Sequence, residues 1–332
     1  MSLHTPYLLF LGDAPDMLAA KVALGVRQWR PEHCVGQFRM DGCKADCGLP
    51  DMTVEQAAAE GARTLVVGVA NRGGVIAPAW ISVLKAALEA GMDLAAGLHN
   101  RLADVPELAE TAARLGRALH DVRVPEDDYP IGNGAKRGGK RLLPVGTDCS
   151  CGKMYTALAI EAELRARGRS ATFRATGQTG ILITGAGVPL DAVIADFISG
   201  AVEALSPDAD PEHWDVIEGQ GSLLHPSFAG VTLGLIHGAQ PDALVLCHEP
   251  TRTHLRGLPH FPLPSLEATI DISLRAARLT NPAAIFVGVS VNTHALDDAA
   301  ADATLRRIAA QTGLPAVDPV RQGVGALVDA LW

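Results

Sequence analysis

Short apolar runs alternate with longer stretches of helical periodicity along the chain. Apolar runs of this length, bounded by turn residues, are typical of buried parallel strands. In the first half we predict strands at 7–11, 64–70 and 94–98 and helices at 16–28, 78–90 and 106–119. This alternation predicts a βαβ layer of Rossmann type. No G-x-G-x-x-G follows a strand there, which disfavours a dinucleotide site.

The second half repeats the alternation with longer helices. We predict strands at 171–175, 214–217, 243–247, 284–289 and 315–317 and helices at 190–205, 266–279 and 297–312. The predicted class is therefore α/β, with an N-terminal Rossmann-like domain at 1–124 and a C-terminal doubly wound parallel sheet at 141–332. Residues 125–140 gather prolines, glycines and charges without periodicity, and we interpret them as a linker or a flap.

The strongest chemical signal lies between 142 and 168. An apolar run meets a turn opened by Gly146, and Gly152 and Lys153 then lead into a stretch of helical periodicity. Strand, glycine-containing loop and helix in this order predict a phosphate-binding loop, because backbone N–H groups, the helix dipole and a lysine ammonium all attract an anion. The predicted phosphate-binding residues are Gly146, Thr147, Asp148, Cys149, Ser150, Cys151, Gly152, Lys153 and Met154.

This loop departs from G-x-x-x-x-G-K-[ST]. Five residues separate its glycines, and Met154 occupies the place of the magnesium-binding hydroxyl residue. Thr156 lies about 200° further around a helix and replaces that ligand poorly. GTDCSCGKM resembles instead the GTD-x-x-x-GKT loop of dethiobiotin synthetase and its relatives. The sequence thus favours phosphate binding over ordinary Mg-ATP chemistry.

Composition narrows the possible partners. The 332 residues carry 28 basic and 37 acidic side chains, a net charge of −9, without long basic runs. This balance excludes a nucleic-acid or anionic-membrane footprint. The first residues fit neither a signal peptide nor a membrane span, so we expect a cytoplasmic protein.

A basic group at 136–141 is interpreted as linker charge or as a phosphate contact. The apolar end of the chain, 325–332, is expected to dock either on a partner subunit, as in a homo-oligomer, or on its own domain.

Six cysteines in a reducing compartment indicate buried thiols rather than disulfides. Cys34, Cys43 and Cys47 lack the spacing of a zinc finger, and no metal site is predicted. In the phosphate loop, a helix N-terminus is expected to lower the pKa of Cys149 and Cys151. A catalytic thiol there is nevertheless disfavoured.

Polar loops follow several predicted strands of the second half. They are TGQTG at 176–180, EGQGS at 218–222 and HEPTR at 248–252, and a further loop at 71–74 lies in the first half. Parallel strands present their carboxyl ends at one edge of a sheet, where α/β proteins bind ligands. The three loops of the second half predict the rim of an active site, whereas loop 71–74 is a ligand loop or a plain turn.

Five ordered motifs carry a family resemblance. GTDCSCGKM, ATGQTGILITGAG, DAVIADFISGAVE, VIEGQGSLLHPS and ALVLCHEPTR together resemble the DgcN family, formerly a domain of unknown function and associated with N-acetylation of D-glutamate and related D-amino acids. The resemblance spans essentially the whole chain. It implies an acetyl-CoA-dependent N-acetyltransferase built on a P-loop domain with a Rossmann-like N-terminal domain. Coenzyme A carries phosphates that such a loop can hold without hydrolysis.

Transfer to an amine needs a base, oxyanion donors and cations for the substrate carboxylates. Glu218 is the leading candidate base because it follows a short strand and precedes glycines; His225, His248 and Glu249 are the alternatives. Arg252 and Arg256 are candidates for binding the carboxylates of a small amino-acid substrate. Neutral hydrogen-bonding groups are offered by Gln178, Thr179, Gln220 and Ser222.

Two other functions remain open from the residues. An ATP- and magnesium-dependent ligase or kinase of the dethiobiotin synthetase type would keep Lys153 on phosphates and place Glu218 or Asp148 on the metal. A nucleotide-binding sensor without catalysis would use the same loop. Met154 counts against the first, and the number of polar loops counts against the second.

Overall fold

The structure is a computed structural model that describes residues 3–17, 19–71, 74–125 and 128–332. The chain forms two compact units. The N-terminal unit comprises Met1–Glu126 and Gly177–Ala192, and the C-terminal unit comprises Asp127–Thr176 and Val193–Trp332. The segment Gly177–Ala192 thus belongs to the N-terminal unit, although the sequence placed it in the second domain.

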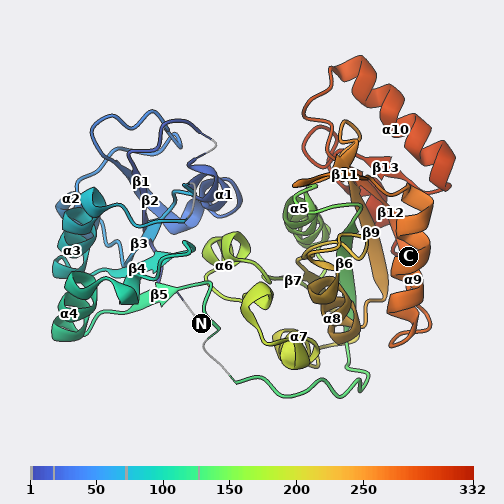
Figure 1. Cartoon of the computed structure of the whole chain (residues 1–332), viewed down its shortest axis with the longest axis horizontal. Coiled ribbons are helices and arrows are strands. Elements are labelled where there is room, and N and C mark those ends of the chain that lie inside the picture. The colour runs from blue at the N-terminus through green and yellow to red at the C-terminus, as the bar shows by residue number, and fades with distance from the viewer. Residues whose placement is uncertain (1–2, 18, 72–73, 126–127) are drawn as a thin grey trace. The chain divides into compact units, whose positions relative to one another are not determined.

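A five-stranded parallel sheet forms the centre of the N-terminal unit, in the order β2-β1-β3-β4-β5. Its strands are β1 (Tyr7–Gly12), β2 (Cys34–Arg39), β3 (Thr64–Val67), β4 (Asp93–Ala96) and β5 (Leu119–Asp121). The order of strands reverses between β1 and β3, and α1 and α3 cover opposite faces of the sheet (Figure 1). Every residue of β1, β3 and β4 is buried, as continuous apolar runs predict.

The helices of this unit are short. They are α1 (Lys21–Trp29), α2 (Val54–Ala59), α3 (Ile81–Glu89), α4 (Pro106–Leu115) and α6 (Gln178–Thr184), with 3-10 turns η1 (Pro31–His33), η2 (Pro78–Trp80), η3 (Leu102–Asp104) and η4 (Leu190–Ala192). Helix α6 packs on α1, where a Cβ on Gly25 would lie 3.4 Å from Ile183 Cδ1. Trp80 and Leu84 are buried in the core cluster of the unit.

Several predicted boundaries in the N-terminal half are wrong for local reasons. The helix predicted from residue 16 begins at Lys21, because the Asp16 carboxylate accepts the backbone N–H of Ala19 and forms a turn instead. The helix predicted to run to 119 ends at Leu115, where Gly116 adopts φ +63° and caps it before β5 begins. Strand β2, which is buried only at its centre, was missed.

A six-stranded parallel sheet forms the centre of the C-terminal unit, in the order β13-β12-β9-β6-β8-β7. Its strands are β6 (Lys140–Gly146), β7 (Ala171–Arg174), β8 (Trp214–Ile217), β9 (Ala243–His248), β12 (Ile285–Val291) and β13 (Ala316–Val317). Helices α5 and α9 lie on opposite sides of this sheet (Figure 1). The two parallel sheets confirm the predicted α/β class.

The remaining elements of this unit are helices and one hairpin. The helices are α5 (Lys153–Ala166), α7 (Ile198–Leu205), α8 (Ala229–Ala239), α9 (Leu266–Arg278), α10 (Asp298–Thr312) and α11 (Gly325–Asp329), with a 3-10 turn η5 (Ala195–Phe197) and an antiparallel pair β10 (His254–Leu255) and β11 (Leu258–Pro262). The helix predicted at 190–205 begins only at Ile198, and α8 and the hairpin were missed. Within the described ranges, no helix has the length and apolar content that crossing a bilayer requires.

Candidate functional site

The predicted phosphate loop connects β6 to α5. Gly152 precedes α5 with φ +106°, and Ser150 also adopts a positive φ of 52°. A Cβ on Gly146 would lie 2.6 Å from Cys151 Sγ and 3.1 Å from Lys153 Nζ. Glycine at this position therefore lets the loop fold back over the end of β6. The first backbone N–H groups of α5 lack partners within the helix, which suits them to an anion.

Lys153 is buried within this loop. Its Nζ donates a hydrogen bond to the carbonyl oxygen of Asp148 at 2.8 Å and lies 3.7 Å from Cys151 Sγ. A Cβ on Gly219 would lie 2.9 Å from Lys153 Cδ and 1.9 Å from the carbonyl oxygen of Pro144. The absence of a side chain at Gly219 thus makes room for the lysine stem. Because the partner of the ammonium is a neutral carbonyl, its charge is available for a phosphate.

Asp148 ties the loop to the segment between β9 and β10. Its buried carboxylate accepts hydrogen bonds from Arg252 Nη1 at 2.6 Å, from the backbone N–H of Arg256 at 2.8 Å and from the backbone N–H of Cys149 at 2.6 Å. Arg252 also donates to the carbonyl of Cys149 and forms an ion pair with Glu249. The guanidinium of Arg252 is therefore engaged by two carboxylates of the protein itself.

Arg256 is placed differently from Arg252. Its side chain is exposed, and its recorded partner is the neutral hydroxyl of Ser150. A guanidinium whose partner is uncharged gains more from a substrate carboxylate than one that already has two anionic partners. The geometry therefore favours Arg256 over Arg252 for binding substrate, although both assignments remain predictions.

Glu218 lies at the end of β8, next to the phosphate loop. It is buried, and its Oε2 accepts the backbone N–H of Thr176 at 2.9 Å. The hydroxyl of Thr176 donates back to the Glu218 carbonyl at 2.7 Å and accepts from Gln220 Nε2 at 3.2 Å. These hydrogen bonds link the loop after β7 to the loop after β8. The Ser222 hydroxyl is buried and accepts from the backbone N–H of Leu224, which closes its own turn.

His248, at the end of β9, lies against the phosphate loop. Its Nδ1 is 3.1 Å from the hydroxyl of Thr147. Burial, with a further contribution from the charge of Arg307, lowers the pKa of His248 to about 4. The imidazole is consequently neutral at pH 7, able to accept a proton but weakly basic.

His225 is an unfavourable base. Its Nδ1 accepts the backbone N–H of Ser227 at 3.2 Å, so its Nε2 carries the proton and donates to the carbonyl of Arg256 at 3.2 Å. With both ring nitrogens engaged and the side chain buried, His225 supports the loop that carries Arg256.

One group in the described residues has the spacing of a metal site. The ligand atoms of Asp148, Cys149 and His225 all lie within 4.8 Å of one another. Their chemistry fits a cation poorly, because the carboxylate is paired with Arg252 and both imidazole nitrogens are engaged. Burial also raises the pKa of Cys149, with the charge of Lys153 opposing this effect. The expectation that the helix N-terminus lowers this pKa is wrong, because desolvation outweighs it.

The cysteines of the N-terminal unit do not form a second such group among the residues that the structure describes. Burial raises the pKa of Cys34 to about 12 and that of Cys47 to about 11. Both are therefore protonated thiols at neutral pH.

Gln178 and Thr179 differ from their predicted setting. They do not lie in a polar loop but begin α6, in the N-terminal unit. Gln178 lines a cavity of that unit, and the Thr179 methyl group lies 3.6 Å from the position of a Cβ on Gly25. Their assignment to the substrate stays a prediction. Of loop 71–74, residues 72 and 73 lie outside the described part.

The basic group at 136–141, which spans the start of β6, is structural. Arg141 is buried and donates to the hydroxyl and carbonyl of Ser206, while Lys136 forms an ion pair with Asp242. Arg137 donates to the carbonyl of Gly238. These side chains fix the start of the central strand, so neither predicted role, solvated charge or phosphate contact, describes Arg141.

Sequence reasoning missed two supporting residues, Gly219 and Ser290. Ser290 Oγ lies 2.7 Å from the Thr156 hydroxyl, which also donates to the Gly152 carbonyl. Thr156 is thereby engaged against β12, in agreement with its poor position for a metal. The spacing of Gly219 from Glu218 was visible in the sequence, but its contact with Lys153 required the fold.

Two family models match the chain. Residues 38–125 match a domain of unknown function described as a Rossmann-like domain (DUF1611_N), and residues 130–328 match one described as a P-loop domain (DUF1611_C). A crystal structure of a DUF1611 family protein from Anabaena variabilis superposes with a TM-score of 0.84 at 35% identity, and 99% of each chain is covered.

Two curated relatives match over nearly their whole length. A protein of Tritonibacter scottomollicae named D-glutamate N-acetyltransferase is 64% identical over 99% of both chains. A protein of a Pseudoalteromonas species with the same name is 50% identical over 99% of both chains. The chain therefore belongs to the DUF1611 family, as the five sequence motifs predicted.

Proposed function

We propose that this chain is an enzyme that transfers the acetyl group of acetyl-CoA to the amino group of D-glutamate. The observation that carries the proposal is the 64% identity, over 99% of both chains, to a protein named for that activity. At this level of identity the polar loops that form the site are expected to be shared. The phosphate loop adds an independent physical argument for the donor.

The loop suits a phosphorylated carrier that is held but not hydrolysed. Lys153 can exchange the Asp148 carbonyl for a phosphate oxygen of coenzyme A, and the first N–H groups of α5 can add hydrogen bonds. Met154 offers no oxygen ligand to magnesium, and Asp148 is already paired with Arg252. Both features disfavour the ATP-dependent alternative and leave acetyl-CoA as the proposed donor.

The chemical step requires a neutral amine. A base takes one proton from the substrate ammonium, the amine nitrogen attacks the thioester carbonyl carbon, and the C–S bond breaks as the N–C bond forms. The electron pair leaves on sulfur, which takes up the second proton of the amine and departs as the free thiol. We assign the base to Glu218, because it is buried, its Oε2 is fixed by Thr176, and the next residue, Gly219, packs against the stem of Lys153.

The substrate carboxylates need cations at the rim. We assign the first of them to Arg256, whose exposed guanidinium bonds a neutral side chain, Ser150, among the described residues. Arg252 would have to release Asp148 or Glu249 before it could bind substrate. Its present role is to hold the phosphate loop against the β9–β10 segment.

The test compares two reactions of the purified chain. Acetyl-CoA with D-glutamate is expected to release free thiol without magnesium, and ATP with magnesium is expected to release no phosphate. Omission of the amino acid is the control for thioester hydrolysis. Phosphate release without thiol release would replace the proposal by the ATP-dependent alternative, and ligand-induced thermal stabilisation without any turnover would favour the non-catalytic sensor.

A further inference from the structure

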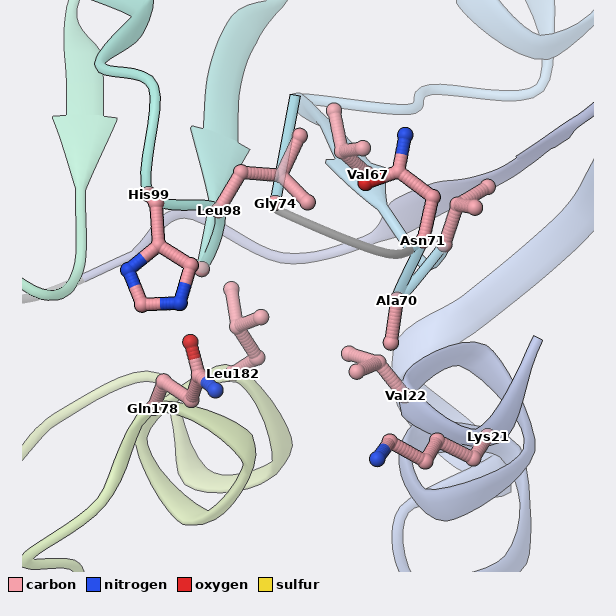
Figure 2. A pocket seen from close by; sticks show the side chains of 12 residues that line it. Lys21, Val22, Val67, Ala70, Asn71, Gly74, Leu98, His99, Gln178 and Leu182 are labelled. Carbon is pink, nitrogen blue, oxygen red and sulfur yellow. The ribbon is translucent and has the colours of Figure 1, made fainter. Parts of the chain in front are cut away.

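A cavity of about 180 Å³ opens in the N-terminal unit, at the carboxyl ends of β3 and β4 (Figure 2). Helix α1, which follows β1, supplies one wall through Lys21 and Val22, and α6 supplies another through Gln178 and Leu182. The order of strands reverses between β1 and β3. Open α/β sheets bind ligands at such a reversal, so the cavity occupies the position where this fold accommodates a ligand.

Two glycines allow the walls of the cavity to approach closely. Gly74 adopts φ +59°, and a Cβ there would lie 2.5 Å from the backbone nitrogen of His99. A Cβ on Gly97 would lie 3.0 Å from Gln178 Oε1. The backbone of the loop after β4 therefore lies directly against the Gln178 amide. The cavity is formed by packing that larger residues at these two positions would disturb.

The size and the walls of the cavity restrict the ligand. Its volume of about 180 Å³ is well below the roughly 300 Å³ at which pockets for drug-sized molecules begin. Val22, Val67 and Leu182 contribute apolar surface. The cavity therefore suits a single small metabolite and is too small for a nucleotide or for coenzyme A.

Three polar side chains, those of Gln178, His99 and Lys21, face this space and, within the part of the chain that the structure describes, form no hydrogen bond with one another. Gln178 Oε1 is buried and accepts no hydrogen bond from the described residues. Figure 2 shows this oxygen pointing toward the ring of His99, with the amino group of Lys21 directed into the cavity from the other side. The Asn71 amide, by contrast, is used by its own loop, since it bonds both backbone groups of Val75.

These groups define the chemistry of a ligand. A buried carbonyl oxygen that lacks a donor calls for an N–H group of the ligand, and an ammonium and an imidazole N–H that line the same cavity call for an anion between them. A free amino acid carries both, an ammonium and a carboxylate separated by one carbon. We propose that this cavity binds a free amino acid, with its ammonium on Gln178 Oε1 and its α-carboxylate on Lys21 and His99.

The experiment is calorimetric titration of the full chain with D-glutamate, with a panel of L-amino acids and with glutarate, which lacks the ammonium. All titrations are done without acetyl-CoA. We expect at least one amino acid to bind at least ten-fold more tightly than glutarate. Lys21→Met and Gln178→Met are each expected to weaken that binding about ten-fold or more. Lys44→Met, which removes an exposed lysine of the same unit that does not line the cavity, is the matched control and should bind like the wild type.

Binding that is equal in the wild type and in both cavity variants would overturn the proposal, as would the absence of binding by every amino acid. Steady-state kinetics then shows whether the bound amino acid is the substrate of acetyl transfer or a different amino acid. A ten-fold rise in the KM for D-glutamate in Lys21→Met, with an unchanged KM for acetyl-CoA, would assign the cavity to the substrate; an unchanged KM would assign it to a second amino acid. Because the titration needs no acetyl transfer, failure of the proposed activity would leave this result standing.

Discussion

The phosphate loop and the N-terminal cavity differ in how their polar groups are satisfied. In the loop, Lys153 bonds to a carbonyl of the loop and Arg252 is paired with Asp148 and Glu249. In the cavity, Gln178 Oε1 has no hydrogen-bond donor, and Lys21 forms no ion pair among the described residues. A ligand of the loop must therefore replace internal partners, whereas a ligand of the cavity completes an unsatisfied set. The first arrangement costs affinity and the second favours binding by small molecules.

The largest effect is expected at the base. Glu218→Gln should lower kcat by about 10²- to 10⁴-fold, because a positioned general base contributes on that order, while the KM for acetyl-CoA stays nearly constant. Steady-state thiol release across pH measures this. Gln220→Glu, in the same loop, is expected to retain a measurable rate. An undiminished kcat in Glu218→Gln would transfer the role of base to His248.

Removal of the loop lysine tests whether its internal bond is exchanged for a phosphate. Lys153→Ala should weaken acetyl-CoA binding about 100-fold, since charge-assisted hydrogen bonds to phosphate contribute on the order of 1.5–3 kcal/mol. Calorimetry with acetyl-CoA measures the change, and Lys85→Ala on the surface of α3 is the control. If the affinity were unchanged, Lys153 would be a structural residue and the phosphate-loop assignment would have to be abandoned.

A substitution at Gly219 tests the packing of the lysine stem. Gly219→Ala would bring a Cβ to 1.9 Å from the Pro144 carbonyl oxygen, and we expect a loss of about 2–3 kcal/mol in the free energy of unfolding. Gly230→Ala is a matched control, because nothing lies within 4 Å of its Cβ and α8 should gain about 0.5–1 kcal/mol. Urea unfolding measures both. Equal stability of the two variants would contradict this expectation. It would show that the backbone at Pro144 and Gly219 can move apart to accept a methyl group without lowering the free energy of unfolding.

Acid should destabilise the protein through His248. Its pKa in the folded protein is about 4, below its ordinary value of 6.5, so the unfolded chain binds the extra proton between these values. Stability is therefore complete above about pH 6.5 and falls by about 2 kcal/mol between pH 7 and pH 5. His248→Gln should abolish this part of the pH dependence in urea unfolding, whereas exchange of the exposed His254 should not. A pH dependence that is the same in both variants would contradict the burial of His248.

Much of the C-terminal unit was predictable because its elements depend on local patterns. Strand β8 was predicted with the bounds that the structure shows, since three of its four buried residues, Trp214, Val216 and Ile217, are large and apolar. The phosphate loop was recognised from glycines and a lysine at short spacing, a feature that chain neighbours alone encode. In the N-terminal unit, by contrast, helix α6 was missed. Its seven residues are too few to display a helical period, and its glycine suggests a loop.

The sequence by itself determined the family, the α/β class, the phosphate loop and the loop position of Glu218, because each depends on residues close together in the chain. Only the tertiary structure decided that Arg252 is bound to Asp148 and that burial raises the pKa of Cys149. It also decided that Gln178 joins Lys21 in one cavity, although 156 residues separate them. Partners, desolvation and cavities arise from contacts between distant segments, and a pattern of neighbours along one chain does not contain them.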